Sequence, residues 1–172
     1  MKTAALVPLE EYLNTTYNPD CDYVDGEVLE RNVGEQDHSD IQSELVHFFR
    51  TRRRTWKARA YVEQRVQVVA RRFRIPDVCV VVGEKPKDPI FHQPPFICIE
   101  VLLPRDSHES MQDRIDDYLK FGVRYVWVIN PRSRRAWVHT SEGIHEAKDG
   151  ILRTENPAFE VPLLELFAEL DQ

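Results

Sequence analysis

Nearly unbroken apolar runs constrain the fold of this chain more than any other feature. Residues 78–82 (VCVVV), 96–103 (FICIEVLL) and 125–129 (YVWVI) are dominated by β-branched, aromatic and other apolar side chains. Short continuous runs of this kind are typical of strands that are covered on both faces. Such strands occupy the centre of a sheet that has helices on each side. The sequence therefore predicts an α/β fold.

The hydrophobic pattern of the rest of the chain predicts the helices and strands that flank the central strands. A helix is predicted from about residue 38 to 56, where Ser39 and Gln42 have the spacing of a capping box. A second helix is predicted over 107–121 and is followed by Gly122, a residue typical of helix C-termini. The other predicted elements are a short helix at 8–13, a hairpin at 23–30, a strand at 61–68, an edge strand at 136–140 and a closing helix at 161–167. This order indicates a central mixed β-sheet flanked by helices, in a single domain over residues 1–172.

Several classes of protein are disfavoured by what the chain lacks. No apolar run approaches the ~18 residues that cross a bilayer, and the N-terminus turns acidic too early for a signal peptide. We therefore expect a cytoplasmic protein that does not enter the membrane. The cysteines, Cys21, Cys79 and Cys98, are too widely spaced for a zinc site or a disulfide framework. No glycine-rich nucleotide-binding motif is present.

Two acidic residues lie where acids are costly. Asp77 heads the run at 78–82, and Glu100 sits inside the run at 96–103. If the two strands are neighbours, both carboxylates can converge at one end of the sheet and form an oxygen-rich site for Mg²⁺ or Mn²⁺. The alternative is that each acid forms an ion pair with a buried arginine or caps a neighbouring chain end, because an unpaired buried carboxylate costs on the order of several kcal/mol.

The charge is strongly segregated along the chain. The net charge is −6, yet residues 50–75 contain ten Lys/Arg and a single acid, Glu63. A segment of this kind can form a positive face that holds the phosphate backbone of DNA. The candidate DNA-binding residues are Arg50, Arg52, Arg53, Arg54, Lys57 and Arg59. The alternatives are a solvated face or a surface for a partner protein.

A series of short motifs then carries a family resemblance. The motifs are Val24-Asp25-Gly26-Glu27, His38-Ser39, Ile75-Pro76-Asp77-Val78, Ile99-Glu100-Val101-Leu102, Tyr118-Leu119 with Gly122-Val123, and YVWVINP at 125–131. In this order they resemble the signatures of the Uma-two family of proposed restriction endonucleases, within the PD-(D/E)XK nuclease superfamily. The resemblance runs from about residue 8 to 167. It implies a restriction-endonuclease-like fold, a divalent metal held by Asp77 and Glu100, and a homodimer as a common assembly.

The chain departs from the family pattern at the positions of the catalytic lysine. The superfamily's lysine stands two residues after the second acid, which is Leu102 here, and the Uma-two lysine corresponds to Arg114. Leu103 also replaces the serine that is usual in the family. Arginine keeps the positive charge that supports a phosphate, but it does not deprotonate in proteins and cannot act as a general base.

These observations predict a Mg²⁺-dependent endonuclease that hydrolyses DNA phosphodiester bonds. Asp77 and Glu100 would bind the metal, and Arg114 would support the scissile phosphate. Glu27 would reach the metal pocket from the hairpin, or be an ordinary acid at a strand end. His38 would bind a phosphate or cap the helix. The alternative function is a catalytically weak or inactive nuclease-fold module that binds DNA or protein.

Two further polar residues belong to the strand predicted ahead of Asp77. Glu63 and Gln64 lie in the strand predicted at 61–68, where a side chain could face the predicted metal pocket.

Overall fold

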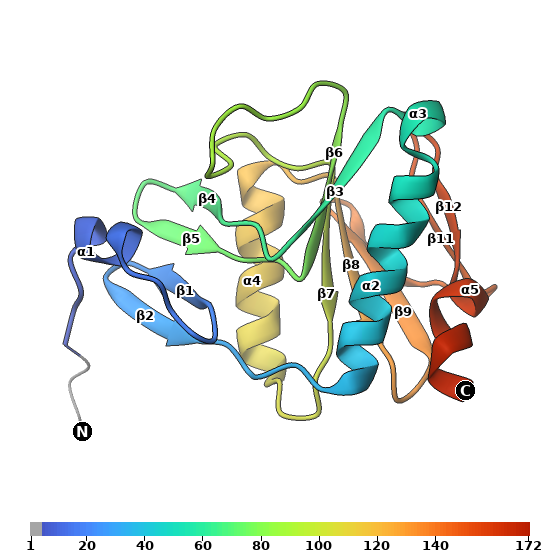
Figure 1. Ribbon diagram of the computed structural model, residues 1–172, viewed down its shortest axis with the longest axis horizontal. Coiled ribbons are helices and arrows are strands. Elements are labelled where there is room, and N and C mark those ends of the chain that lie inside the picture. The colour runs from blue at the N-terminus through green and yellow to red at the C-terminus, as the bar shows by residue number, and fades with distance from the viewer. Residues whose placement is uncertain (1–4) are drawn as a thin grey trace.

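A six-stranded mixed sheet forms the centre of the computed structural model, which describes residues 5–172 (Figure 1). The strand order is β10–β9–β8–β7–β6–β3, and β7 and β8 are parallel while the other neighbours are antiparallel. The strands are β3 (Ala58–Val62), β6 (Val78–Val82), β7 (Ile97–Val101), β8 (Tyr125–Asn130), β9 (Arg135–Thr140) and β10 (Gly143–Glu146). The predicted central mixed sheet flanked by helices is confirmed.

Successive residues of the central strands point to opposite faces, and each face carries its own apolar core. In β7, Ile97 and Ile99 join the core beneath α2 (Gln36–Thr51), whereas Cys98 joins the core beneath α4 (His108–Phe121). Figure 1 shows α2 and α4 on opposite sides of the sheet. Because side chains alternate with a period of two, Glu100 falls on the same face as Cys98 and is directed toward α4.

A second, four-stranded antiparallel sheet packs beside α4. Its order is β2–β1–β5–β4, and α1 (Leu9–Asn14) packs against it through Tyr12. Tyr12, Tyr23 and Phe73 form its small buried core. The strands are β1 (Cys21–Val24), β2 (Glu27–Glu30), β4 (Val66–Val69) and β5 (Arg72–Arg74).

The remaining elements cover the α2 face of the central sheet. A two-stranded sheet and two short helices follow β10 and place Phe159, Leu163 and Leu166 in the core beneath α2. They are β11 (Ile151–Arg153), β12 (Glu160–Pro162), α5 (Leu163–Phe167) and the 3₁₀ helix η1 (Ala168–Asp171), while the one-turn α3 (Arg53–Trp56) follows α2. Among the described residues, no helix is both long and apolar enough to cross a membrane.

Three local predictions are wrong. The strand at 136–140, predicted at an edge, is β9 and lies inside the sheet, because β10 pairs along its outer side. The strand predicted at 61–68 is two strands, because the chain turns at Glu63, whose φ is 48°, and passes from β3 in the central sheet to β4 in the second sheet. The capping box is also absent, since Ser39 lies inside α2 and Gln42 instead donates a hydrogen bond to the carbonyl of Asp77 (2.8 Å). In contrast, α4 begins and ends as predicted, with Ser107 as N-cap and Gly122 as C-cap.

Candidate active site

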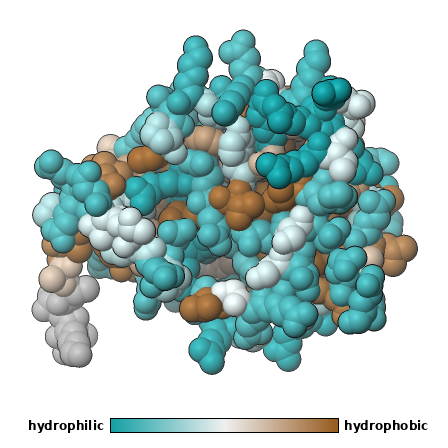
Figure 2. Space-filling model, viewed as in Figure 1, coloured by the Kyte–Doolittle hydropathy of each residue, from teal (hydrophilic) through white to brown (hydrophobic). Residues whose placement is uncertain are grey.

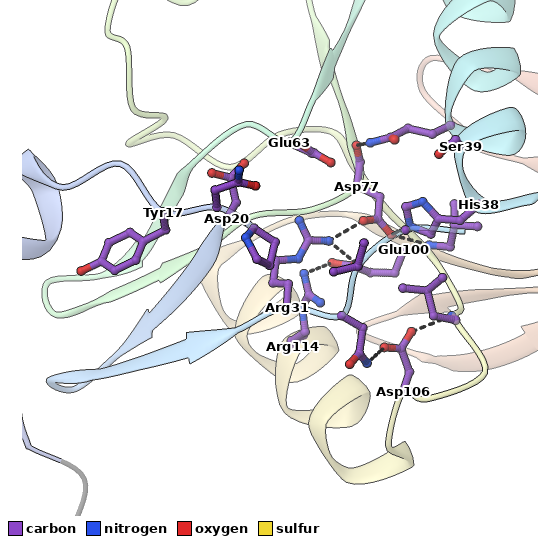
Figure 3. A pocket seen from close by; sticks show the side chains of 18 residues that line it. Tyr17, Asp20, Arg31, His38, Ser39, Glu63, Asp77, Glu100, Asp106 and Arg114 are labelled. Carbon is purple, nitrogen blue, oxygen red and sulfur yellow. Dashed lines mark hydrogen bonds and ion pairs between the residues drawn. The ribbon is translucent and has the colours of Figure 1, made fainter. Parts of the chain in front are cut away.

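Asp77 and Glu100 lie side by side at one end of the central sheet. Because β6 and β7 are antiparallel and Val78 pairs with Ile99, the start of β6 lies next to the end of β7. The carboxylate of Asp77 accepts a hydrogen bond from the backbone N–H of Val101 (2.7 Å), which fixes it beside Glu100. Both acids are buried, and both line a polar cavity of about 340 Å³ (Figure 3). The predicted convergence of the two acids is confirmed.

Asp77 is held as a carboxylate by several donors. Its Oδ1 forms an ion pair with Arg31, and its Oδ2 is 3.2 Å from His38 Nε2 as well as bonded to the Val101 N–H. Burial opposes ionisation of Asp77, but the hydrogen bond from His38 and the charge of Arg31 hold the pKa of this carboxyl well below its usual range. Burial likewise opposes protonation of His38, yet its contact with Asp77 raises the pKa of the imidazole.

Glu100 is held mainly by α4. Its Oε1 accepts a hydrogen bond from the Tyr118 hydroxyl (2.7 Å) and lies 3.0 Å from Arg114 Nη2. Its Oε2 is buried with no hydrogen-bond partner among residues 5–172, and Arg31 Nη2 is 3.9 Å away. Burial raises the pKa of Glu100 to about 7, although the charge of Arg114 acts in the opposite direction.

Arg114 belongs to a wider buried ionic network. Its guanidinium also donates to the carbonyl of Ile75 (2.8 Å) and lies 3.5 Å from Asp22 in β1. Arg74 in β5 pairs with the same Asp22 (3.0 Å) and with Asp117 in α4 (2.7 Å). These contacts join the second sheet to α4 and give Arg114 a fixed position. The alternative interpretation of Glu100, an ion pair with a buried arginine, is therefore confirmed.

The arrangement fits a metal that needs few protein ligands. Two neighbouring carboxylates supply oxygen atoms, and Glu100 Oε2 is a buried acceptor without a donor within the described chain. No cluster of three or more His, Cys, Asp or Glu side chains in residues 5–172 is arranged to hold a metal. Mg²⁺ commonly binds one or two carboxylates and completes its shell with water and substrate phosphate. Asp77 and Glu100 are the residues that would hold it.

Other predicted site residues divide into those at the cavity and those away from it. His38, Arg114 and Glu63 line the cavity with the two acids. Glu27 is exposed at the start of β2 and does not line the cavity, so its predicted reach into the metal pocket is wrong. The side chain of Gln64 donates to the carbonyls of Arg65 and Pro89 and is also outside the cavity lining.

Of the two roles predicted for His38, capping of the helix is wrong, and phosphate binding stays a prediction. It lies in the first turn of α2, whose N-cap is Glu35, and its ring contacts Asp77 instead of capping the helix. Its side chain is buried against the acid, which makes it part of the carboxylate site.

The basic segment lies at the other end of α2 from this site (Figure 1). Arg50 ends the exposed face of α2, and Arg52 stacks on the ring of Phe48 at 3.6 Å. Figure 2 shows mainly hydrophilic residues over this face of the molecule. The remaining basic candidates line a separate shallow hollow with Gly83 and Glu84; they are Arg53, Arg54, Lys57 and Arg59. The structure does not bring these residues together with Asp77.

Three contacts of the site were not predicted from sequence. Arg31 lies in the connection between β2 and α2, where neither periodicity nor a motif marks it. Asp22 is one of several acids in the N-terminal segment. Tyr118 is marked only by the family motif. Its spacing of four residues from Arg114 places both side chains on one face of α4 and could have indicated a shared partner.

The fold is α/β, with two buried acids at one end of a central mixed sheet. A crystal structure described as a putative nuclease belonging to DUF820 from Anabaena variabilis ATCC 29413 superposes with a TM-score of 0.82 and 24% sequence identity, over 95% of this chain and 99% of that one. This likeness shows a shared fold. The sequence profile of the Uma2 family, whose description is "Putative restriction endonuclease", matches residues 9–169. The chain therefore belongs to the Uma2 family, as the sequence motifs predicted. Comparison with curated proteins gave no match.

Proposed function

We propose that this protein is a Mg²⁺- or Mn²⁺-dependent endonuclease that hydrolyses DNA phosphodiester bonds. The observation that carries the proposal is the placement of Asp77 and Glu100 side by side, buried at one sheet end and open to a polar cavity. Burying two carboxylates next to each other is costly, so the arrangement favours a function that uses both. Family membership and the nuclease-like fold support the same assignment.

Each residue has a role that follows from its contacts. Asp77 and Glu100 would hold the ion, which when bound activates water and stabilises the charge that develops on the phosphate. Tyr118 and Arg114 fix Glu100 from α4, and His38 fixes Asp77 from α2. Arg114 also lines the cavity, so it can contribute positive charge toward a bound phosphate.

The second candidate function is a nuclease-fold module that binds DNA or protein and cleaves weakly or not at all. Two observations favour it. The positions at which the resemblance places a lysine hold Leu102 and Arg114, and neither can act as a general base. The two acids also already have arginine partners, Arg31 and Arg114, without any metal.

The decisive experiment is a plasmid-nicking assay with Mg²⁺, Mn²⁺ or EDTA. Wild type should convert supercoiled plasmid to nicked and linear forms with either metal and not with EDTA. Asp77→Asn and Glu100→Gln should abolish this conversion. Asp113→Asn is the matched control, because Asp113 is exposed on α4 and its substitution changes the charge equally.

Folding must be checked in the same preparations, because Asp77 also accepts the Val101 N–H. Circular dichroism and thermal melting of each variant separate a lost active site from a lost fold. Absence of metal-dependent cleavage by folded wild type, with DNA retention on a gel, would favour the binding module instead.

A further inference from the structure

Arg31 occupies the space between the two acids. It lies in the coil that joins β2 to α2, and its side chain is only 13% exposed. Its Nη2 pairs with Asp77 Oδ1 and is 3.9 Å from Glu100 Oε2 (Figure 3). One guanidinium therefore bridges both carboxylates from the side of the cavity.

The oxygen atoms that Arg31 faces are the two that the rest of the protein leaves available. Asp77 Oδ2 already accepts from Val101 and contacts His38. Glu100 Oε1 already accepts from Tyr118 and pairs with Arg114. Asp77 Oδ1 and Glu100 Oε2 are therefore the oxygen atoms that a divalent ion would find without another protein donor. Those are the atoms that Arg31 covers.

We propose that Arg31 is an internal competitor for the metal, and that the site accepts a divalent cation only when this guanidinium withdraws. The proposal rests on the metal-dependent function above and adds a residue that regulates loading. A guanidinium and a dication cannot share the same pair of oxygen atoms, because both are cations and each needs direct contact. The apparent metal affinity of wild type is then reduced by the fraction of molecules in which Arg31 is bound to the acids.

Arg31 is better suited to leave than Arg114. Arg114 is carried by a helix and is held by the carbonyl of Ile75 and by Asp22 as well as by Glu100. Arg31 is carried by a coil, and within the described residues its side chain forms ion pairs with Asp77 and Glu100 alone. The two guanidinium groups also repel each other, since each carries a positive charge near Glu100. Withdrawal of Arg31 breaks fewer contacts.

The test is the affinity of Mn²⁺ for Arg31→Gln, measured by isothermal titration calorimetry on the full chain without nucleic acid. Removal of the competitor should tighten Mn²⁺ binding at least tenfold, and the metal-induced rise in melting temperature should be larger than in wild type. Arg105→Gln is the matched control, because Arg105 is exposed on the loop that follows β7. It removes the same charge near the cavity without removing a carboxylate contact, so its Mn²⁺ affinity should stay within about twofold of wild type, as expected for an exposed charge.

Arg31→Lys is a second variant, which keeps the positive charge. A lysine is a single point charge that cannot span both oxygen atoms as a guanidinium does, so its Mn²⁺ affinity should lie between those of wild type and Arg31→Gln. Equal Mn²⁺ affinity in wild type and in every folded Arg31 variant would overturn the proposal. An equal gain in Arg105→Gln would also overturn it, because general electrostatics would then explain the change.

Failure of this proposal is distinct from failure of the proposed function. If wild type cleaves DNA and Mn²⁺ affinity does not depend on Arg31, only the competition is wrong. If neither wild type nor Arg31→Gln cleaves, but Arg31→Gln binds Mn²⁺ more tightly, the competition stands and the nuclease assignment is wrong.

Discussion

Replacement of Arg114 by alanine should destabilise the fold more than any exposed substitution. Arg114 lies 3.0 Å from Glu100, donates to the carbonyl of Ile75 at 2.8 Å and faces Asp22 at 3.5 Å, all in a buried setting. Removing one partner of a buried pair costs about 3–5 kcal/mol, because the other charge stays buried without compensation. For a chain of this length the loss corresponds to a fall of roughly 6–20 °C in melting temperature.

The loss of stability in Arg114→Ala should increase with pH, because Glu100 is ionised at high pH and protonated at low pH. Burial already raises the pKa of Glu100 to about 7, and removal of Arg114 takes away a charge that lowers it. A group whose pKa is higher in the folded state stabilises at low pH and loses that contribution as pH rises through the folded value. The destabilisation by Arg114→Ala should therefore be smaller at pH 5 than at pH 8, since protonated Glu100 needs no cation.

Urea denaturation at several pH values measures this effect. The control Arg132→Ala removes an exposed arginine and should change stability by no more than about 0.5 kcal/mol. Combining Arg114→Met with Glu100→Gln removes both charges and should recover much of the stability, because neutral replacement of a buried pair is often tolerated. A loss below about 1 kcal/mol for Arg114→Ala, on the scale of an exposed ion pair, would refute the reasoning.

Three further outcomes follow from other contacts. Tyr118→Phe removes the hydrogen bond to Glu100 and should cost about 1–3 kcal/mol in urea denaturation, whereas an unchanged midpoint would mean that the bond is not formed. Burial lowers the pKa of His139, so the free energy of unfolding should fall as pH drops below 6.5, the ordinary pKa of histidine. His139→Leu should flatten that pH dependence. An equal slope in both proteins would contradict the role of His139. Arg53→Gln combined with Arg54→Gln should reduce the log–log salt dependence of DNA binding by about 0.9 per lost phosphate contact, and an unchanged slope would remove these arginines from the DNA interface.

The centre of the fold is predictable because its signal is local. Continuous apolar runs mark β6, β7 and β8, and the amphipathic pattern with Gly122 marks α4. The switch between sheets at Glu63 is not local, because the alternation of apolar residues continues from β3 into β4 while the strands pair with different neighbours. Short strands at the edges, such as β10 with its exposed residues, bury too little to leave a clear pattern.

The candidate site also combines residues with a local sequence signal and residues without one. Asp77 and Glu100 are conspicuous because each interrupts or heads an apolar run, and Arg114 is found through the family motif. Arg31 has no such mark, since its role depends on where a coil crosses the end of the sheet. The basic segment is visible in the sequence, but its placement depends on the direction of α2, which carries it away from the acids.

For the proposed nuclease function, that direction has a consequence for the length of nucleic acid that would be engaged. His38 and Arg50 lie near opposite ends of α2, and a rise of about 1.5 Å per residue separates them by roughly 18 Å along the helix axis. At about 3.4 Å per nucleotide, a strand must extend roughly five nucleotides beyond the scissile phosphate before it reaches the arginines. Oligonucleotides shorter than this would touch only one end of α2, so binding should strengthen abruptly once a strand spans both ends.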